Sequence, residues 1–321
     1  MSLLNAPMAA LAWLGRQGTR AIAALVLVGL VAPPIDALLK PFVTETIFVL
    51  LCIAFLRVDI VALRGYLSRP FIVLSATLWT TFAVPVLFGV IGTVIGLDTR
   101  SPDLLLGLML QAAASPMMAA PALAALMSLD ATLVLVTLVT STALVPFTAP
   151  LFVFVFVGPV LTLSPIALGV KLSAILAGSA LVGLSLRRFA GASRIERYKD
   201  EINGLNVLAL FVFVAAVMEN VAARLIAAPL MIAALAALAF GVFFALFAIT
   251  ALIFASAGRE RALALGFMTS QRNMGLMLAA TGGALPDLTW LYFALSQFPI
   301  YLSPQMLKPL VRRLQRDPKS S

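Results

Sequence analysis

The chain has 321 residues, a net charge of +9, 62% hydrophobic and 11% charged residues, and a mean hydropathy of +1.10. A soluble domain cannot cover its surface with so few charged residues, so the composition excludes a soluble protein and indicates one embedded in lipid. The lack of histidine excludes imidazole chemistry and His-ligated zinc or haem, and the single cysteine, Cys52, excludes a disulfide framework.

Continuous apolar runs of about 20 residues predict transmembrane helices, because alternating segments of about ten would be needed for membrane strands. Arg16 and Arg20 flank an apolar stretch that we interpret as an interfacial amphipathic lead-in. The sequence then predicts about ten transmembrane helices, at residues 20–39, 42–63, 70–96, 103–128, 131–156, 163–186, 203–223, 228–256, 261–284 and 287–310.

The basic residues are distributed unevenly over the connections between these predicted helices. Seventeen of the 22 Lys and Arg residues lie in connections on the N-terminal side, four lie on the opposite side, and Arg272 lies inside a predicted helix. Because cytoplasmic connections carry an excess of basic residues, we expect a multi-pass protein of a bacterial inner membrane with both termini in the cytoplasm.

The predicted helices form two sets of five with opposite topology, as expected for an inverted repeat. The fourth helix of each set contains polar or helix-breaking residues at membrane depth. Unwound backbone is tolerated there only where it faces protein or a watery cavity, and paired broken helices indicate a transport site. The interrupting residues are Ser115, Pro116 and Pro121 in the first set, and Thr269, Ser270, Gln271, Arg272 and Asn273 in the second.

Arg272 is the most informative of these residues, because a charge at mid-membrane costs several kcal/mol unless it is paired or hydrated. One interpretation is that its guanidinium binds an anionic group of a solute, with Gln271, Asn273 and Ser270 as hydrogen-bonding neighbours. The other is that it pairs permanently with a carboxylate or with carbonyls freed in the first broken helix. The two interpretations are compatible.

Other polar residues inside predicted helices allow more than one interpretation. Thr137 and Ser141 share one face of the fifth helix, which either lines a cavity or bonds back to its own carbonyls. Asp130 is predicted to cap the N-terminus of that helix. Glu219 is either an interfacial residue near Arg224 or a titrating group that lines the site.

Six short segments carry a resemblance to the bile acid:sodium symporter family. They are Leu-Arg-Val-Asp at 56–59, Leu-Ser-Arg-Pro at 67–70, Ser-Pro at 115–116, Leu-Asp at 129–130, Arg-Ala-Leu-Ala-Leu-Gly at 261–266 and Arg-Asn-Met-Gly-Leu at 272–276. The resemblance implies a single transporter unit of ten helices over residues 1–321. It also implies a panel domain (20–63 and 163–223), a core domain (70–156 and 228–310), and a substrate site near the crossing of the broken helices.

The chain departs from this family where sodium is expected to bind. Alignment on Asn273 places Met268 and Arg272 at positions of a glutamate and a glutamine, and Ala120 and Pro121 at positions of a serine and an asparagine. Sodium prefers several oxygen ligands, and a fixed positive charge repels it. The resemblance therefore implies sodium as the coupling ion, whereas the residues present predict sodium independence and no metal site.

These observations predict a secondary transporter for a small organic, anionic solute that works by alternating access. It would be neither an enzyme, since no catalytic constellation is present, nor a nucleic-acid-binding protein. A cation/proton antiporter-like or efflux carrier of the same broken-helix fold is a first alternative, although the crossing lacks a titrating carboxylate. A membrane sensor without transport activity is a second.

Overall fold

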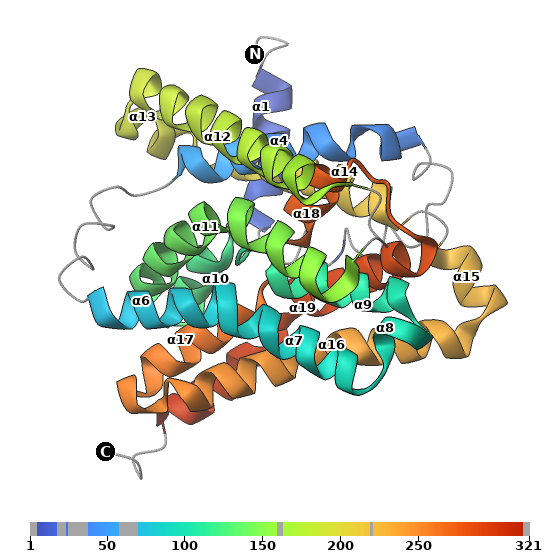
Figure 1. Cartoon of the computed structure of the whole chain (residues 1–321). Coiled ribbons are helices and arrows are strands. Elements are labelled where there is room, and N and C mark those ends of the chain that lie inside the picture. Colours follow the sequence, from blue (N-terminus) through green and yellow to red (C-terminus); the bar gives the residue numbers. More distant parts are fainter. Residues whose placement is uncertain are drawn as a thin grey trace. The chain divides into compact units, whose positions relative to one another are not determined.

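The computed structural model of the chain describes residues 5–17, 24, 38–57, 70–158, 163–218 and 221–316. Within these ranges the secondary structure is helical and no strand occurs (Figure 1). Five helical segments are long and apolar enough to cross a membrane, namely Pro70–Val94, Ala131–Val157, Pro165–Ala190, Lys199–Ala227 and Pro229–Ile253. The prediction of an all-α membrane protein is therefore confirmed, while the count of ten helices and the inverted repeat stay predictions.

The chain divides into two compact units, one of residues 1–58 and 173–232 and the other of residues 59–172 and 233–321. Their interpretation as panel and core domains stays a prediction. Most of the predicted helix at 20–39 and the residue Glu219 lie outside the described residues.

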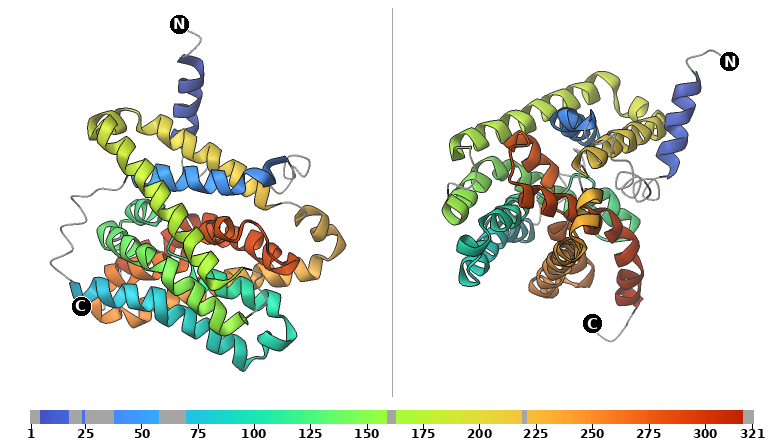
Figure 2. Two further views of the ribbon diagram at one scale, coloured as in Figure 1. Left: turned by 45° about the horizontal axis from the view of Figure 1, so that its top comes forward. Right: turned by 90° about the vertical axis from the view of Figure 1, so that its right-hand side faces the viewer.

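The first unit packs its helices closely through glycine. Its helices are α1 (Asn5–Gln17), α4 (Val43–Leu56), the later part of α12 (Pro165–Ala190), α13 (Ala192–Arg197), α14 (Lys199–Val217) and α15 (Val221–Ala227). Helices α1 and α14 lie against each other (Figure 2), because Gly15 and Gly204 present no side chain at the contact. A Cβ atom on Gly204 would come within 2.0 Å of the carbonyl oxygen of Leu11.

The second unit contains the two interrupted helices. The run predicted at 103–128 consists of α9 (Pro102–Ala113) and α10 (Ala120–Leu126), and the run predicted at 261–284 consists of α17 (Arg259–Ser270) and α18 (Met274–Thr281). The prediction that both helices are broken is therefore confirmed. Around them lie α6 (Pro70–Leu78), η2 (Trp79–Ala83), α7 (Val84–Val94), α8 (Leu97–Arg100), α11 (Ala131–Val157), most of α16 (Pro229–Ile253), η4 (Ala255–Ala257) and α19 (Asp287–Arg316).

Two local features fix these elements in the second unit. The Asp130 side chain accepts a hydrogen bond from the N–H of Leu133 at 2.9 Å, which confirms its predicted role as the N-cap of α11. The segment η2 is a π-helical turn between α6 and α7 that the hydrophobic pattern of the sequence did not predict. Such turns widen a helix locally and leave carbonyl groups without their usual partners.

Candidate functional site

The breaks between α9 and α10 and between α17 and α18 pair with each other through their backbones. Met117 donates its N–H to the carbonyl of Gln271, and Asn273 donates its N–H to the carbonyl of Ser115, each over 2.7 Å. The two bonds belong to an isolated antiparallel bridge at Arg272. Non-helical backbone inside a membrane protein must find such partners, and here each break supplies them to the other.

Arg272 ties this crossing to a third element. Its side chain is 1% exposed, and its Nη1 donates to the carbonyl of Ala114 at 2.9 Å and to the carbonyl of Thr80 at 3.3 Å. Ala114 follows the last residue of α9, and Thr80 lies in η2. One guanidinium nitrogen therefore bridges the end of a broken helix and a π-helical turn.

The Thr80 carbonyl is free to accept this bond because of the residues that follow it. Val84 donates its N–H five residues back, to Trp79, as in a π-helix. The next residue, Pro85, has no N–H, so the helix supplies no donor for Thr80. The combination of π-turn and proline thus creates the acceptor that Arg272 uses.

The other edge of the same guanidinium is unused. Neither Nε nor Nη2 of Arg272 has a hydrogen-bond partner among the described residues, and none of the described carboxylates forms an ion pair with it. One N–H of each of these two nitrogens points in parallel from the same edge of the planar guanidinium, which is the geometry that matches the two oxygens of a carboxylate. The hydrogen bonds to backbone carbonyls use Nη1 alone. Nε and Nη2 are therefore left as donors for the anionic group that the other interpretation of Arg272 requires.

The predicted neighbours of Arg272 in the second break have different structural roles. The Gln271 side chain donates to the carbonyl of Ile300 and to the hydroxyl of Ser303, while its Oε1 has no partner among the described residues. The Asn273 side chain caps α18 by accepting from the N–H of Leu276 at 3.2 Å. Because the Asn273 carbonyl oxygen accepts this capping bond, its amide NH₂ is the donor left to contact a solute.

Two residues that we assigned to the second break lie in α17, so that part of the prediction was wrong. Thr269 and Ser270 continue the helix, and the break contains Gln271, Arg272 and Asn273 alone. The Ser270 hydroxyl bonds back to the carbonyl of Phe267, which satisfies it inside the helix. The Thr269 hydroxyl lies 3.4 Å from that of Thr80 and so faces η2.

The first break is likewise shifted from its predicted position. Pro121 lies in the first turn of α10, where its missing N–H costs nothing, so it begins a helix and does not unwind one. Ser115 and Pro116 are in the break as predicted. The Ser115 hydroxyl is buried beside the Arg272 crossing and has no partner among the described residues.

The hydroxyls on the polar face of α11 differ in whether they bond back to their own helix; that this face lines a cavity stays a prediction. Thr140 bonds back to the carbonyls of Val136 and Thr137 and also contacts the hydroxyl of Thr77. The hydroxyls of Thr137, Ser141 and Thr142 are buried, and none has a partner in the described part of the chain. Among these four hydroxyls, back-bonding therefore holds for Thr140 alone.

The positions matched to the family's sodium ligands are apolar or cationic here. Met268 and Ala120 are fully buried and offer no oxygen from their side chains. Within the described ranges, no cluster of three His, Cys, Asp or Glu side chains could hold a metal ion. The oxygen atoms near the break that remain without protein partners are neutral: the Ser115 hydroxyl and Gln271 Oε1.

A groove in the second unit is separate from this crossing. It is lined by residues of α6, η2, α7, α16, η4 and α17 and includes none of the predicted site residues. It meets the crossing at η2, where Trp79 lines the groove and the carbonyl of the next residue, Thr80, accepts from Arg272.

In comparisons with known proteins, no family model matches this chain and no curated protein matches it.

Proposed function

We propose that this protein is a secondary transporter that moves a small organic anion across the membrane by alternating access, with the crossing at Arg272 as its solute site. The proposal includes membership of the bile acid:sodium symporter family, with ten transmembrane helices in two inverted repeats and both termini in the cytoplasm of a bacterial inner membrane. The observation that carries it is the unused Nε and Nη2 edge of a fully buried guanidinium.

The energetic argument begins from the cost of burying this charge. An isolated cation at membrane depth costs several kcal/mol, and carbonyl dipoles at a single nitrogen compensate only part of that cost. A carboxylate that binds both free nitrogens would neutralise the charge and satisfy the remaining donors in one contact. The Ser115 hydroxyl and the Asn273 amide supply further donors beside the break.

We propose further that transport does not depend on sodium. The Arg272 nitrogen donates to two backbone carbonyls, which are the type of oxygen ligand a sodium ion would otherwise use. A guanidinium held at this place repels a second cation, and the neighbouring Met268 supplies no ligand oxygen. The fixed positive charge would then stabilise the crossing without a bound metal.

A binding screen followed by a flux measurement tests the proposal. The purified protein is screened for thermal stabilisation by organic monocarboxylates, dicarboxylates and sulfonates, since a ligand of the folded state raises its apparent stability. Anions that stabilise the protein are then assayed for uptake into proteoliposomes with either sodium or potassium outside, under a clamped membrane potential.

We expect at least one anion to be taken up at equal rates in the two salts. A strong stimulation by sodium would contradict sodium independence while leaving transport intact. An anion that binds but shows neither uptake nor counterflow would contradict transport and support the sensor alternative.

A further inference from the structure

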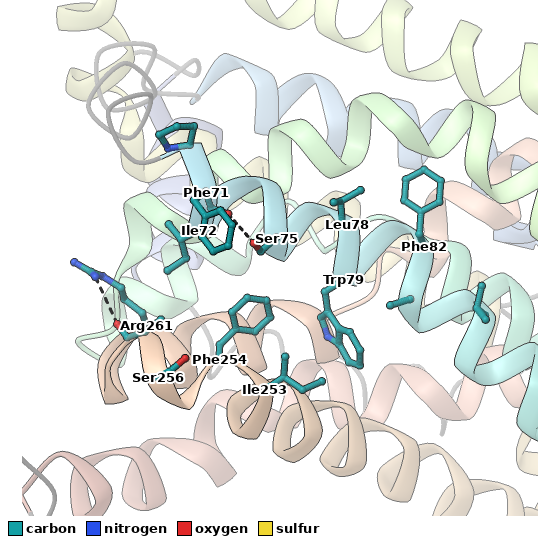
Figure 3. A pocket seen from close by; sticks show the side chains of 14 residues that line it. Phe71, Ile72, Ser75, Leu78, Trp79, Phe82, Ile253, Phe254, Ser256 and Arg261 are labelled. Atoms are coloured by element: carbon teal, nitrogen blue, oxygen red, sulfur yellow. Dashed lines mark hydrogen bonds between the residues drawn. The ribbon is translucent and has the colours of Figure 1, made fainter.

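A long apolar groove with one cationic end lies on the second unit, apart from the Arg272 crossing. Its volume is about 1130 Å³, and Figure 3 shows its walls and its charged end. Arg261 is the only charged side chain among the described residues that line it. The lining includes Phe71, Leu78, Trp79, Phe82 and Arg261.

The groove runs along two segments that are long and apolar enough to cross a membrane. One wall follows α6, η2 and α7 from Pro70 to Val86, and the other is the end of α16 with η4 and the start of α17. Residues 70 to 86 extend about 24 Å at about 1.5 Å per residue, more than the roughly 15 Å of hydrocarbon in one leaflet. The groove is therefore long enough to receive an acyl chain along its whole length.

The cationic end coincides with the end of both membrane-spanning segments. The first segment starts at Pro70 and the other ends at Ile253, and both residues line the groove with Arg261. In Figure 3 the Arg261 side chain lies at one end of the groove, beside Phe71 and Ile72. A basic side chain at this level is positioned to meet a lipid headgroup.

The contacts of Arg261 with protein are long. Its Nε lies 3.9 Å from Asp130 Oδ2, and its Nη1 donates to the carbonyl of Ala257 over 3.5 Å. The side chain is 34% exposed. These contacts leave part of the hydrogen-bonding capacity of the guanidinium unused.

We infer that this groove binds an anionic phospholipid, with the phosphate at Arg261 and an acyl chain along α6, η2 and α7. The exposed side chains of Phe71, Leu78 and Phe82 supply the apolar contact. The charge of Arg261 selects an anionic over a zwitterionic headgroup. Because Trp79 and Thr80 are consecutive in η2, the bound chain borders the turn that holds Arg272.

Trp79 provides a direct reporter of the bound chain. It lies nine residues after Pro70, or about 13 Å along the helix, which places it beside the middle of the membrane. The chain contains three tryptophans, so Trp13→Phe with Trp290→Phe leaves Trp79 as the sole indole. This variant is reconstituted in two samples of phosphatidylcholine bilayers that contain the same mole fraction of a lipid brominated at mid-chain. The brominated lipid is phosphatidylglycerol in one sample and phosphatidylcholine in the other, and the quenching of Trp79 fluorescence is measured in both.

We expect brominated phosphatidylglycerol to quench Trp79 more strongly than brominated phosphatidylcholine. Its relative affinity should be about fivefold higher, because one basic side chain attracts a nearby anionic headgroup by about this factor. Arg261→Gln should remove the preference. Arg312→Gln is the matched control, because Arg312 lines a different, small basic pocket, and it should leave the preference unchanged.

Equal quenching by the two brominated lipids in the Trp79 protein itself would overturn the inference, because hydrocarbon would then fill the groove without headgroup selection. Cholate is then added below its micellar concentration. If it abolishes the quenching of Trp79 by brominated phosphatidylglycerol, the inference is also overturned, because the groove would then bind a soluble organic anion. Neither result depends on the transport assay, so the proposed function stands or fails separately.

Discussion

Nη1 of Arg272 donates to the carbonyl oxygen of Ala114 over 2.9 Å, so the residue after one broken helix is tied to the centre of the other break. The same nitrogen reaches Thr80, which lies in neither break. Only a guanidinium offers both a donor for these carbonyls and a second pair of parallel N–H groups.

Two substitutions of Arg272 separate its structural contacts from solute binding. Arg272→Gln removes the charge and leaves the carbonyls of Ala114 and Thr80 without this donor. We expect it to destabilise the protein by about 1–3 kcal/mol and to abolish solute binding. Arg272→Lys keeps a cation that can reach one carbonyl but lacks the paired edge, so it should retain more stability than Arg272→Gln and still bind the solute at least tenfold more weakly.

Thermal unfolding in detergent and binding of the stabilising anion measure these two effects for each variant. Full solute binding by Arg272→Lys would show that the paired edge is not the solute contact. Equal loss of stability and binding in both variants would assign Arg272 a purely structural role.

The cap of α11 provides a test that is independent of function. Asp130→Ala removes the acceptor of the Leu133 N–H, and we expect a loss of about 1 kcal/mol. Asp130→Asn keeps a good capping side chain while it removes the charge near Arg261, so it should lie close to the parent in thermal unfolding. If Asp130→Asn is as unstable as Asp130→Ala, the ion pair and not the cap is what stabilises this turn.

The sequence predicted the broken helices because proline and polar residues interrupt apolar runs, and it predicted the Asp130 cap because a capping residue directly precedes its helix. It misplaced Thr269, Ser270 and Pro121, since a polar residue can satisfy itself inside a helix and a proline can begin one. It also missed η2. Pro85 was a local signal for it, but only the three-dimensional contact with Arg272 shows which freed carbonyl is used.

Tyr292 and Gln111 form a buried polar pair between α19 and α9, in which the phenol donates to Gln111 Oε1. Tyr292→Phe or Gln111→Leu alone leaves the other polar group buried and unsatisfied, and each should cost about 1–3 kcal/mol. The double variant should be less destabilised than the sum of the two, because it removes both polar groups. A double-mutant cycle of thermal unfolding measures this coupling, and strictly additive losses would show that the hydrogen bond contributes nothing to stability.

The approach of α1 to α14 depends on Gly204, where an added methyl group would collide with the backbone of Leu11. Because backbone atoms cannot rotate away, Gly204→Ala should force the two helices apart and destabilise the protein by about 1–3 kcal/mol. Gly241→Ala is the matched control, since a Cβ there meets no atom within 4 Å and alanine favours the helix by roughly 0.5–1 kcal/mol. Thermal unfolding of the two variants should therefore shift in opposite directions. A neutral Gly204→Ala would mean that α1 contributes nothing to the stability of the folded protein.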